Sequence, residues 1–177
     1  MKGFTRKNQL FSLCGLNCGL CTMHLGGHCG GCGNGNQSCK IARCSLEHGG
    51  VEYCCECPHY PCEQYEKCDE YDSFITHRKR KADMEKLRRI GADRYNAEQE
   101  EKVRLLGYLL STCNDGRRKT LFCLAVNLLE LADVQAVADR LMASDLSTVK
   151  ERAVYAAALL QEAAGEKGIA LKLNRKK

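Results

Sequence analysis

Cysteines are the residues in this chain whose type and spacing indicate a chemical role. Three C-x-x-C pairs occur: Cys18 with Cys21, Cys29 with Cys32, and Cys54 with Cys57. Such a turn directs two thiolates to the same side, where both can bind one tetrahedral metal ion at about 2.3 Å for zinc. The spacing therefore predicts metal ions held by thiolates.

The cysteines are sufficient for two metal sites. The first two pairs form C-x2-C-x7-C-x2-C, which is typical of a compact four-thiolate site. A second site would draw on the later cysteines: Cys39, Cys44, Cys54, Cys57 and Cys62. Structural zinc contributes about 10 kcal/mol or more to folding a small domain. Because apolar residues between positions 14 and 62 are few and unpatterned, we expect two zinc ions to hold this segment together.

The same thiolates also fit iron–sulfur or redox chemistry. Residues 14–21, CGLNCGLC, match the C-x3-C-x2-C triad with which radical S-adenosylmethionine enzymes hold a [4Fe–4S] cluster. The alternation of strands and helices that their partial barrel requires does not follow. Cys14, Cys18 and Cys21 with a fourth cysteine could still hold a cluster for electron transfer, and surplus thiols could sense oxidants. An iron–sulfur or thiol-redox protein is therefore the alternative hypothesis.

Histidines and the remaining cysteines are expected to have other roles. Four histidines lie among the cysteines: His24, His28, His48 and His59. Any of them could replace a thiolate in a Cys3His site, but cysteine is in surplus, which favours solvated or locally hydrogen-bonded histidines. His77 is expected to be exposed on a basic helix. Cys55 and Cys68 are expected to be spare thiols, and Cys113 and Cys123 small core residues on helices.

The distribution of cysteine divides the chain of 177 residues. Twelve of the 14 cysteines lie at or before Cys68, and the composition changes after that point. We therefore expect a cysteine-rich metal-binding module over residues 1–68 and an α-helical domain over residues 69–177. The predicted fold class is mainly α, with an irregular N-terminal module followed by a small helical bundle.

Apolar residues at helical spacing predict four or five helices after residue 62. The expected segments are 63–91, 97–113, 117–132, 133–144 and 147–165. Gly91 is placed to end the first of them. Asp133 is expected to cap the fourth, and either Ser147 or Thr148 the last. A short helix is also expected after Cys39, closed by glycine after His48.

Four motifs carry a resemblance to a known family. In order, CGLNCGLC, CGGC, CKIARC and CECPHYPCE resemble the DUF3795 family, small cysteine-rich proteins named as a domain of unknown function. The resemblance covers about residues 12–66 and implies metal binding, without an activity. It points to ten cysteines as ligands: Cys14, Cys18, Cys21, Cys29, Cys32, Cys39, Cys44, Cys54, Cys57 and Cys62. The stretch between Cys21 and Cys29 is shorter than in many members, which often carry a helical insertion there.

Charge gives limited support to a nucleic-acid partner. The net charge is +5 and the pI about 8.5, below the strongly basic values of dedicated binders. Basic runs occur at residues 78–81, 86–89, 117–119 and 175–177. Acidic residues alternate with the first two runs, which favours a solvated helix face. The sequence therefore predicts a metal-stabilised binding protein that contacts a protein or nucleic-acid partner.

Motifs for catalysis, export and membrane insertion are not found in the sequence. There is no H-E-x-x-H, G-x-S-x-G or phosphate-binding loop, and all-cysteine zinc sites are normally closed and structural. The apolar run near the N-terminus is broken by Ser12, Cys14 and Gly15, and no stretch reaches about 18 apolar residues. We expect a cytoplasmic binding protein rather than an enzyme. In a reducing cytosol its cysteines would be metal ligands rather than disulfides.

Overall fold

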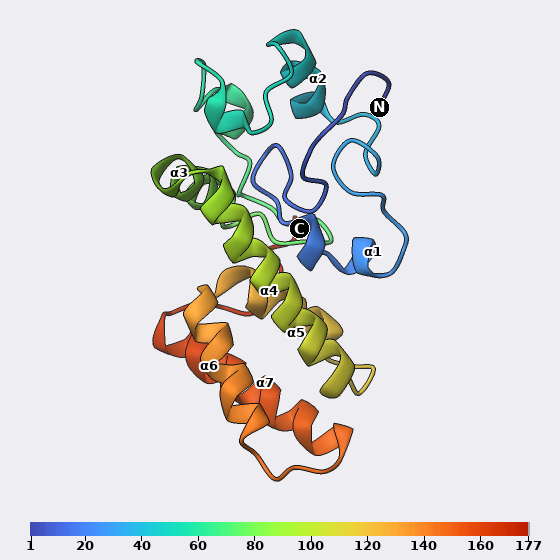
Figure 1. Cartoon of the computed structure of the whole chain (residues 1–177), viewed down its shortest axis with the longest axis vertical. Coiled ribbons are helices and arrows are strands. Elements are labelled where there is room, and N and C mark those ends of the chain that lie inside the picture. The colour runs from blue at the N-terminus through green and yellow to red at the C-terminus, as the bar shows by residue number, and fades with distance from the viewer. Residues whose placement is uncertain (177) are drawn as a thin grey trace.

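Helices and irregular loops build the computed structural model, which describes residues 1–176 (Figure 1). Lys177, the last residue of the predicted helical domain and of the last basic run, lies outside the described residues. Within residues 1–176 the β-structure is limited to one isolated antiparallel bridge between Phe11 and Asn17. The mainly α fold class is therefore confirmed. In this part of the chain no helix is long and apolar enough to cross a membrane.

Short helices occupy the cysteine-rich part and longer helices follow it. The short ones are η1 (Cys18–Leu20), α1 (Thr22–Leu25), α2 (Lys40–Glu47), η2 (Cys54–Glu56) and η3 (Glu63–Tyr65). The longer ones are α3 (Arg80–Ile90), α4 (Ala92–Thr112), α5 (Lys119–Leu128), α6 (Leu131–Met142) and α7 (Val149–Glu166). The predicted number of four or five helices is confirmed, as is the short helix after Cys39. Figure 1 shows α4 running from the cysteine-rich part into the bundle formed with α5, α6 and α7.

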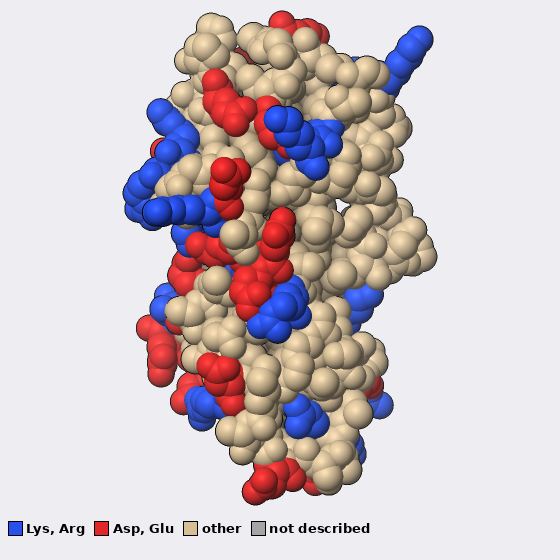
Figure 2. All heavy atoms as spheres, viewed as in Figure 1, with Lys and Arg blue, Asp and Glu red and all other residues tan. Residues whose placement is uncertain are grey.

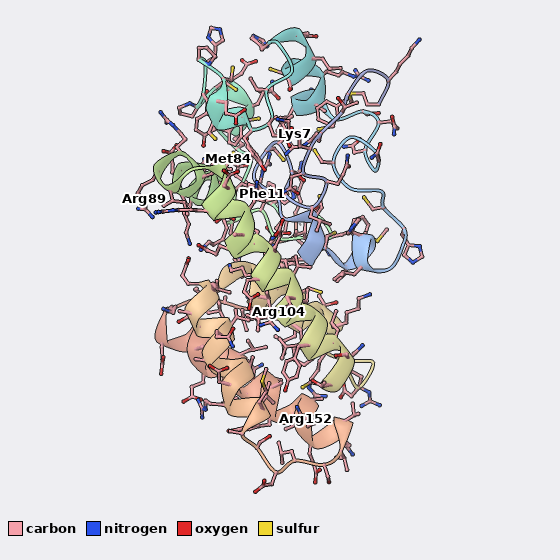
Figure 3. All side chains as sticks on the ribbon, in the orientation of Figure 1. Lys7, Phe11, Met84, Arg89, Arg104 and Arg152 are labelled. Carbon is pink, nitrogen blue, oxygen red and sulfur yellow. The ribbon has the colours of Figure 1, made fainter. Side chains whose placement is uncertain are left out.

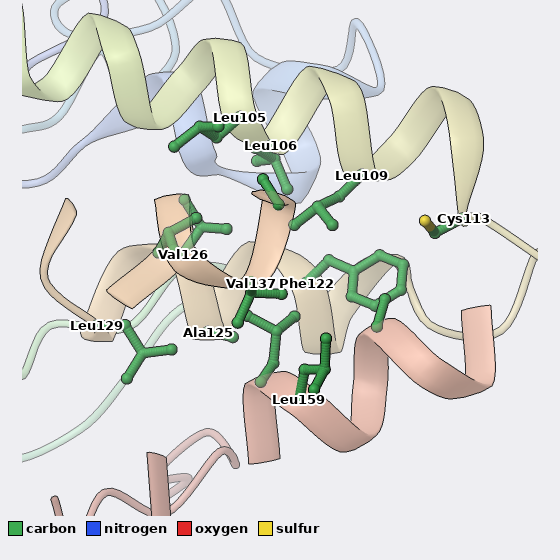
Figure 4. Packing of buried hydrophobic residues seen from close by; sticks show 14 of the residues in the cluster. Leu105, Leu106, Leu109, Cys113, Phe122, Ala125, Val126, Leu129, Val137 and Leu159 are labelled. Atoms are coloured by element: carbon green, nitrogen blue, oxygen red, sulfur yellow. The ribbon is translucent and has the colours of Figure 1, made fainter. Parts of the chain in front are cut away.

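The larger core lies between helices α4, α5, α6 and α7. Leu105, Leu106 and Leu109 of α4 face α5, where Phe122 and Val126 are fully buried (Figure 4). Burying a side chain of this size contributes about 1.5–3 kcal/mol. The apolar stripes that predicted the helices are therefore also the surfaces that hold them together. The prediction that Cys113 and Cys123 are small core residues is confirmed, because both are buried in this cluster.

A second, smaller core joins the cysteine-rich part to α3 and α4. The ring of Phe11 lies 5.5 Å from that of Tyr53 and 4.5 Å from that of Tyr95, between centroids. Met84 and Leu87 of α3 complete the cluster. Aromatic pairs at such distances contribute about 0.5–1.5 kcal/mol beyond the area they bury. Within residues 14–62 only Cys14 and Tyr53 are buried in this core, and the other buried members come from outside that range, so the sequence did not indicate it.

Helix α3 is shorter than the sequence predicts, because it begins at Arg80 rather than near residue 63. The Asp72 carboxylate accepts hydrogen bonds from the His77 backbone N–H at 2.7 Å and the Asn174 backbone N–H at 2.7 Å. The Asp72 N–H donates to the Asn174 carbonyl at 2.8 Å. Side-chain hydrogen bonds of this kind offer the backbone an alternative to helix, so the segment before Arg80 is a loop tied to residues near 174.

Helix caps agree with the sequence at most positions. Gly91 has φ +86° and separates α3 from α4, as predicted. The Thr148 hydroxyl accepts from the Glu151 N–H at 3.2 Å, which selects Thr148 over Ser147 as the cap of α7. The prediction for Asp133 is wrong. Helix α6 begins at Leu131, and the Asp133 carboxylate instead accepts from the backbone N–H of Glu130, the capping residue, at 3.2 Å.

Arg80 connects α3 to the cysteine-rich loops. Its guanidinium donates to the Cys14 carbonyl at 3.2 Å and the Cys68 carbonyl at 3.1 Å, and lies over the Tyr65 ring at 5.6 Å. The residue is only 7% exposed. Gly15 adopts φ +93° beside it, and an added Cβ would lie 2.7 Å from the Arg80 carbonyl oxygen. The loop around Cys14 therefore packs closely against the first turn of α3.

We expect Arg80→Ala to lower the free energy of unfolding by about 3 kcal/mol, because it leaves two carbonyls without their charged donor. The measurement is urea unfolding followed by circular dichroism. Arg88→Ala is the matched control, since that side chain lies on the same helix and is 52% exposed; its effect should stay within about 0.5 kcal/mol. Equal effects of the two substitutions would contradict the anchoring role of Arg80.

Thr148→Ala should destabilise the chain by about 1 kcal/mol through loss of the cap of α7. Ser147→Ala is the control, because Ser147 is exposed and precedes the capping residue. It should change the free energy of unfolding by no more than about 0.5 kcal/mol. A larger loss for Ser147→Ala than for Thr148→Ala would show that the cap is misassigned.

Candidate metal centre

Thiols of the cysteine-rich part gather in two groups. The inner group is Cys14, Cys18, Cys21 and Cys32. The outer group is Cys44, Cys57 and Cys62, with Cys54 lying between the two groups. Figure 3 shows the sulfur atoms concentrated in the part of the molecule that contains Lys7 and Phe11. All 14 cysteines lie in the described part of the chain, and all are free thiols.

The inner group is built on the loop that packs against Arg80 and on η1. Cys14 and Cys21 are buried, and the Ser12 hydroxyl oxygen lies 2.8 Å from the Cys18 sulfur. Burial raises the pKa of Cys18 to about 12, and the neighbouring Cys32, Cys14 and Cys21 thiolates add to the rise. Several buried thiolates repel each other, so they ionise together only if a cation neutralises them. Thiolate is a donor that zinc prefers, so these four residues are candidate ligands.

The outer group lines a cavity of about 30 Å³. Cys44 lies in helix α2 and His48 follows its last residue, whereas Cys54, Cys57 and Cys62 come from the segment around η2 and the turn before η3. This volume exceeds the minimum of about 10–15 Å³ for one water molecule, so it is also of the right order for one ion among its ligands. The cavity therefore lies between α2 and the segment that follows it in the chain.

The grouping differs from the one that sequence spacing suggests. Spacing pairs Cys18 and Cys21 with Cys29 and Cys32, whereas the structure places Cys14 beside Cys18 together with Cys21 and Cys32. The Cys29 sulfur instead lies directly over Gly35, where an added Cβ would have no room. Cys39 precedes α2 and is not part of the cavity lining.

Neither group is a closed coordination shell. Within residues 1–176, no three Cys, His, Asp or Glu side chains already stand at distances that would close around one ion. A zinc–sulfur bond is about 2.3 Å long, so metal binding requires the thiols to turn inward. Each cysteine has three staggered χ1 positions, so its sulfur can change direction by side-chain rotation. The structure thus presents two sets of neighbouring donors.

Histidines outside the cavity mostly match the expectation of local hydrogen bonding or exposure. The His24 Nδ1 atom lies 2.9 Å from the Cys29 carbonyl oxygen, and His28 and His59 are exposed. The prediction for His77 is wrong: it is half-buried in the loop before α3. Its ring nitrogens lie 3.0 Å from the Ser73 hydroxyl and 3.2 Å from the Cys68 carbonyl oxygen.

The basic residues of α3 are largely committed to the protein itself. Lys79 and Lys86 both form ion pairs with Glu130 at the start of α6, and Lys86 also pairs with Glu98 at 2.5 Å. Partial burial disfavours the ionised form, but these hydrogen bonds from Lys79 and Lys86 lower the pKa of Glu130 to about 2. On the face shown in Figure 2, basic and acidic side chains are intermixed rather than separated.

A buried carboxylate and a buried ammonium were missed by the sequence analysis. Lys102 is 3% exposed, and its ammonium donates to the Leu129 carbonyl at 2.6 Å. Asp83 is 8% exposed, and the charges of Lys79 and Lys102 act on it. Burial lowers the pKa of Lys102 to about 8 and raises that of Asp83 to about 6. The signal in the sequence is that Lys102 falls on the same helical stripe as the leucines at 105, 106 and 109.

Comparisons of the chain with protein-family models, with curated proteins and with solved structures gave no match. They therefore neither support nor contradict the resemblance to the DUF3795 family, which stays a prediction.

The raised pKa of Asp83 predicts a pH dependence of stability. Because the folded state holds this proton more tightly than the unfolded state, stability falls as pH rises from about 4 to about 6. The free energy of unfolding of the wild type, relative to that of Asp83→Asn, should fall by about 2 kcal/mol between about pH 4 and pH 7. Urea unfolding at each pH measures it, and the subtraction removes the titration of other groups. Glu85→Gln, an exposed change on the same helix, should show no such trend.

Proposed function

We propose that this chain is a metal-stabilised binding protein whose cysteine-rich part holds two zinc ions through its thiolates. The observation that carries the proposal is the gathering of thiols into two neighbouring groups on loops that pack against an aromatic core. The ligands of both sites would come from the ten cysteines that the sequence analysis names as ligands. The metal would stabilise the loops, while the helical bundle has its own apolar core.

Zinc suits these donors because thiolate is its commonest ligand in closed structural sites. A bound divalent cation deprotonates a coordinating thiol outright, so it offsets the burial that holds the pKa of Cys18 and Cys54 high. Free thiols in this number are maintained in a reducing compartment, which supports a location in the cytoplasm. Closed sites of this kind are structural, so the proposal is for a binding protein rather than an enzyme.

A protein partner is better supported than a nucleic acid. Arg80 and Lys102 are buried, and Lys79 and Lys86 are paired with Glu130, so four cations that could contact phosphates are already used. Large apolar side chains are instead exposed: Tyr71, Phe74, Met142, Val149 and Val154. Tyr, Phe and Met are enriched at protein interfaces, which supports a protein partner.

An iron–sulfur protein is the second candidate, favoured by one observation. Cys14, Cys18 and Cys21 form the C-x3-C-x2-C triad, and the structure adds Cys32 beside Cys18 as a fourth thiol. Four cysteines are the ligand set of a [4Fe–4S] cluster. Such a cluster would give the inner group an electron-transfer role with the same residues.

Metal analysis of full-length protein purified without oxygen, with a visible spectrum, tests the proposal. About two zinc ions per chain and no colour would support it. Iron with acid-labile sulfide and a brown colour would replace it with the iron–sulfur candidate. A chain that is folded without either metal would overturn both. Binding of duplex DNA or single-stranded RNA at about 0.15 M salt would replace the protein partner with nucleic acid.

Cys57→Ser should reduce the zinc content from about two ions to about one, because it removes a donor of the outer group. Cys55→Ser is the matched control: it lies two residues away and does not line the outer cavity. Its zinc content should equal that of the wild type. Both variants should keep the helical signal of α4 to α7, measured by circular dichroism, because the larger core contains neither residue.

A further inference from the structure

A serine and a histidine stand at hydrogen-bond distance in the loop before α3. The Ser73 hydroxyl oxygen lies 3.0 Å from the His77 Nε2 atom. The other acceptor near that hydroxyl, the Ile75 carbonyl oxygen, is 3.5 Å away, so the imidazole is the closer partner. A neutral imidazole at this distance can take the hydroxyl proton and thereby activate the oxygen as a nucleophile.

The other nitrogen of the His77 ring orients it for this role. The Nδ1 atom lies 3.2 Å from the Cys68 carbonyl oxygen, to which it donates when the proton is on Nδ1. That tautomer leaves the Nε2 lone pair free to accept from Ser73. Burial lowers the pKa of His77, the charge of Arg80 adds to this effect and that of Asp72 opposes it, so the ring is neutral at about pH 7. A nucleophile, a base and an orienting group are therefore in contact with each other.

A buried carboxylate holds the backbone on both sides of this pair. Asp72 is 8% exposed and accepts from the His77 N–H at 2.7 Å and from the Thr76 hydroxyl at 3.2 Å. The Asn174 N–H donates to the same carboxylate at 2.7 Å. Because Ser73 directly follows Asp72, these bonds restrict the positions that the serine and the histidine can take relative to each other.

The surroundings of Ser73 fit a small apolar group on an open surface. Ser73 is exposed, and two aromatic residues within two positions of it, Tyr71 and Phe74, are 46% and 59% exposed. Within residues 1–176 the Phe74 backbone N–H donates no hydrogen bond, so it is available to an oxyanion that forms on an attacked carbonyl. The cavity that Phe74 lines is about 10 Å³, room for one water molecule at most. A substrate would therefore lie on the surface.

We propose that Ser73 and His77 hydrolyse esters of short, apolar carboxylic acids. The Ser73 oxygen attacks the ester carbonyl while its proton passes to the His77 Nε2 atom. The bond from the carbonyl carbon to the alcohol oxygen then breaks, and the alcohol leaves with that proton. Water next attacks the acyl-serine and gives a proton to the imidazole, and the acid is released as Ser73 regains this proton. The activity goes beyond the proposed function, because it uses none of the ten cysteines proposed as ligands.

The test measures hydrolysis of p-nitrophenyl butyrate and labelling by a fluorophosphonate probe, using the full chain as wild type, Ser73→Ala, His77→Gln and Ser111→Ala. Ser111 is the matched control because it is exposed and its hydroxyl donates to the Tyr108 carbonyl rather than to a histidine. All four forms keep the 14 cysteines, so the reaction of free thiols with the ester is the same in each.

The probe should label the wild type at Ser73, located by peptide mass spectrometry, and His77→Gln should slow this labelling by about 100-fold or more. Ester hydrolysis by Ser73→Ala should fall to the thiol background, whereas Ser111→Ala should match the wild type. Circular dichroism of each variant checks that the helices are folded.

Equal hydrolysis by the wild type and Ser73→Ala, or labelling of Ser73 no faster than that of Ser111, would overturn the inference. Labelling of His77→Gln at the wild-type rate would also overturn it, because the serine would then act without its base. The zinc content of the same preparations tests the proposed function separately. About two zinc ions per chain without ester hydrolysis would therefore remove this inference alone.

Discussion

The burial of helix α4 against two different cores is the interaction on which the rest of the structure depends. Near its start, Tyr95 packs on Phe11 in the smaller core, and further along, Leu105 and Leu109 enter the larger one. A helix of 21 residues is about 32 Å long at 1.5 Å per residue, so one rigid element spans both parts. The contacts of α4 with both cores therefore help to position the cysteine-rich loops and their thiols relative to the helical bundle.

Sequence periodicity predicted the helices well, because helix formation depends on side chains three and four residues apart. The short helix α2 and the ends at Gly91 and Thr148 were predicted for the same local reason. The failures involve partners far away in the chain. The helix expected from residue 63 is replaced by a loop because Asp72 bonds to Asn174, and no local pattern contains that pairing.

Long-range packing also explains what the sequence could not tell about the site. C-x-x-C spacing identifies cysteines that can share an ion, and the pair Cys18 and Cys21 does lie in one group. Spacing also grouped Cys32 with Cys18 in the four-thiolate site and Cys14 with Cys18 in the iron–sulfur alternative, but it did not show that Cys29 lies against Gly35 instead. The smaller core was missed because its rings come from positions 11, 53, 65 and 95, which share no periodicity.

The hydrogen bonds between Asp72 and Asn174 also determine when part of the chain can fold during synthesis. The two residues are 102 positions apart, and Arg78 likewise donates to the Ala170 and Lys172 carbonyls. Domains on a ribosome tend to fold as units from the N-terminal side. Here the loop after the cysteines stays without its partner until the residues following α7 have emerged. The segment between Cys68 and Arg80 can therefore reach its final position only after α7 is complete.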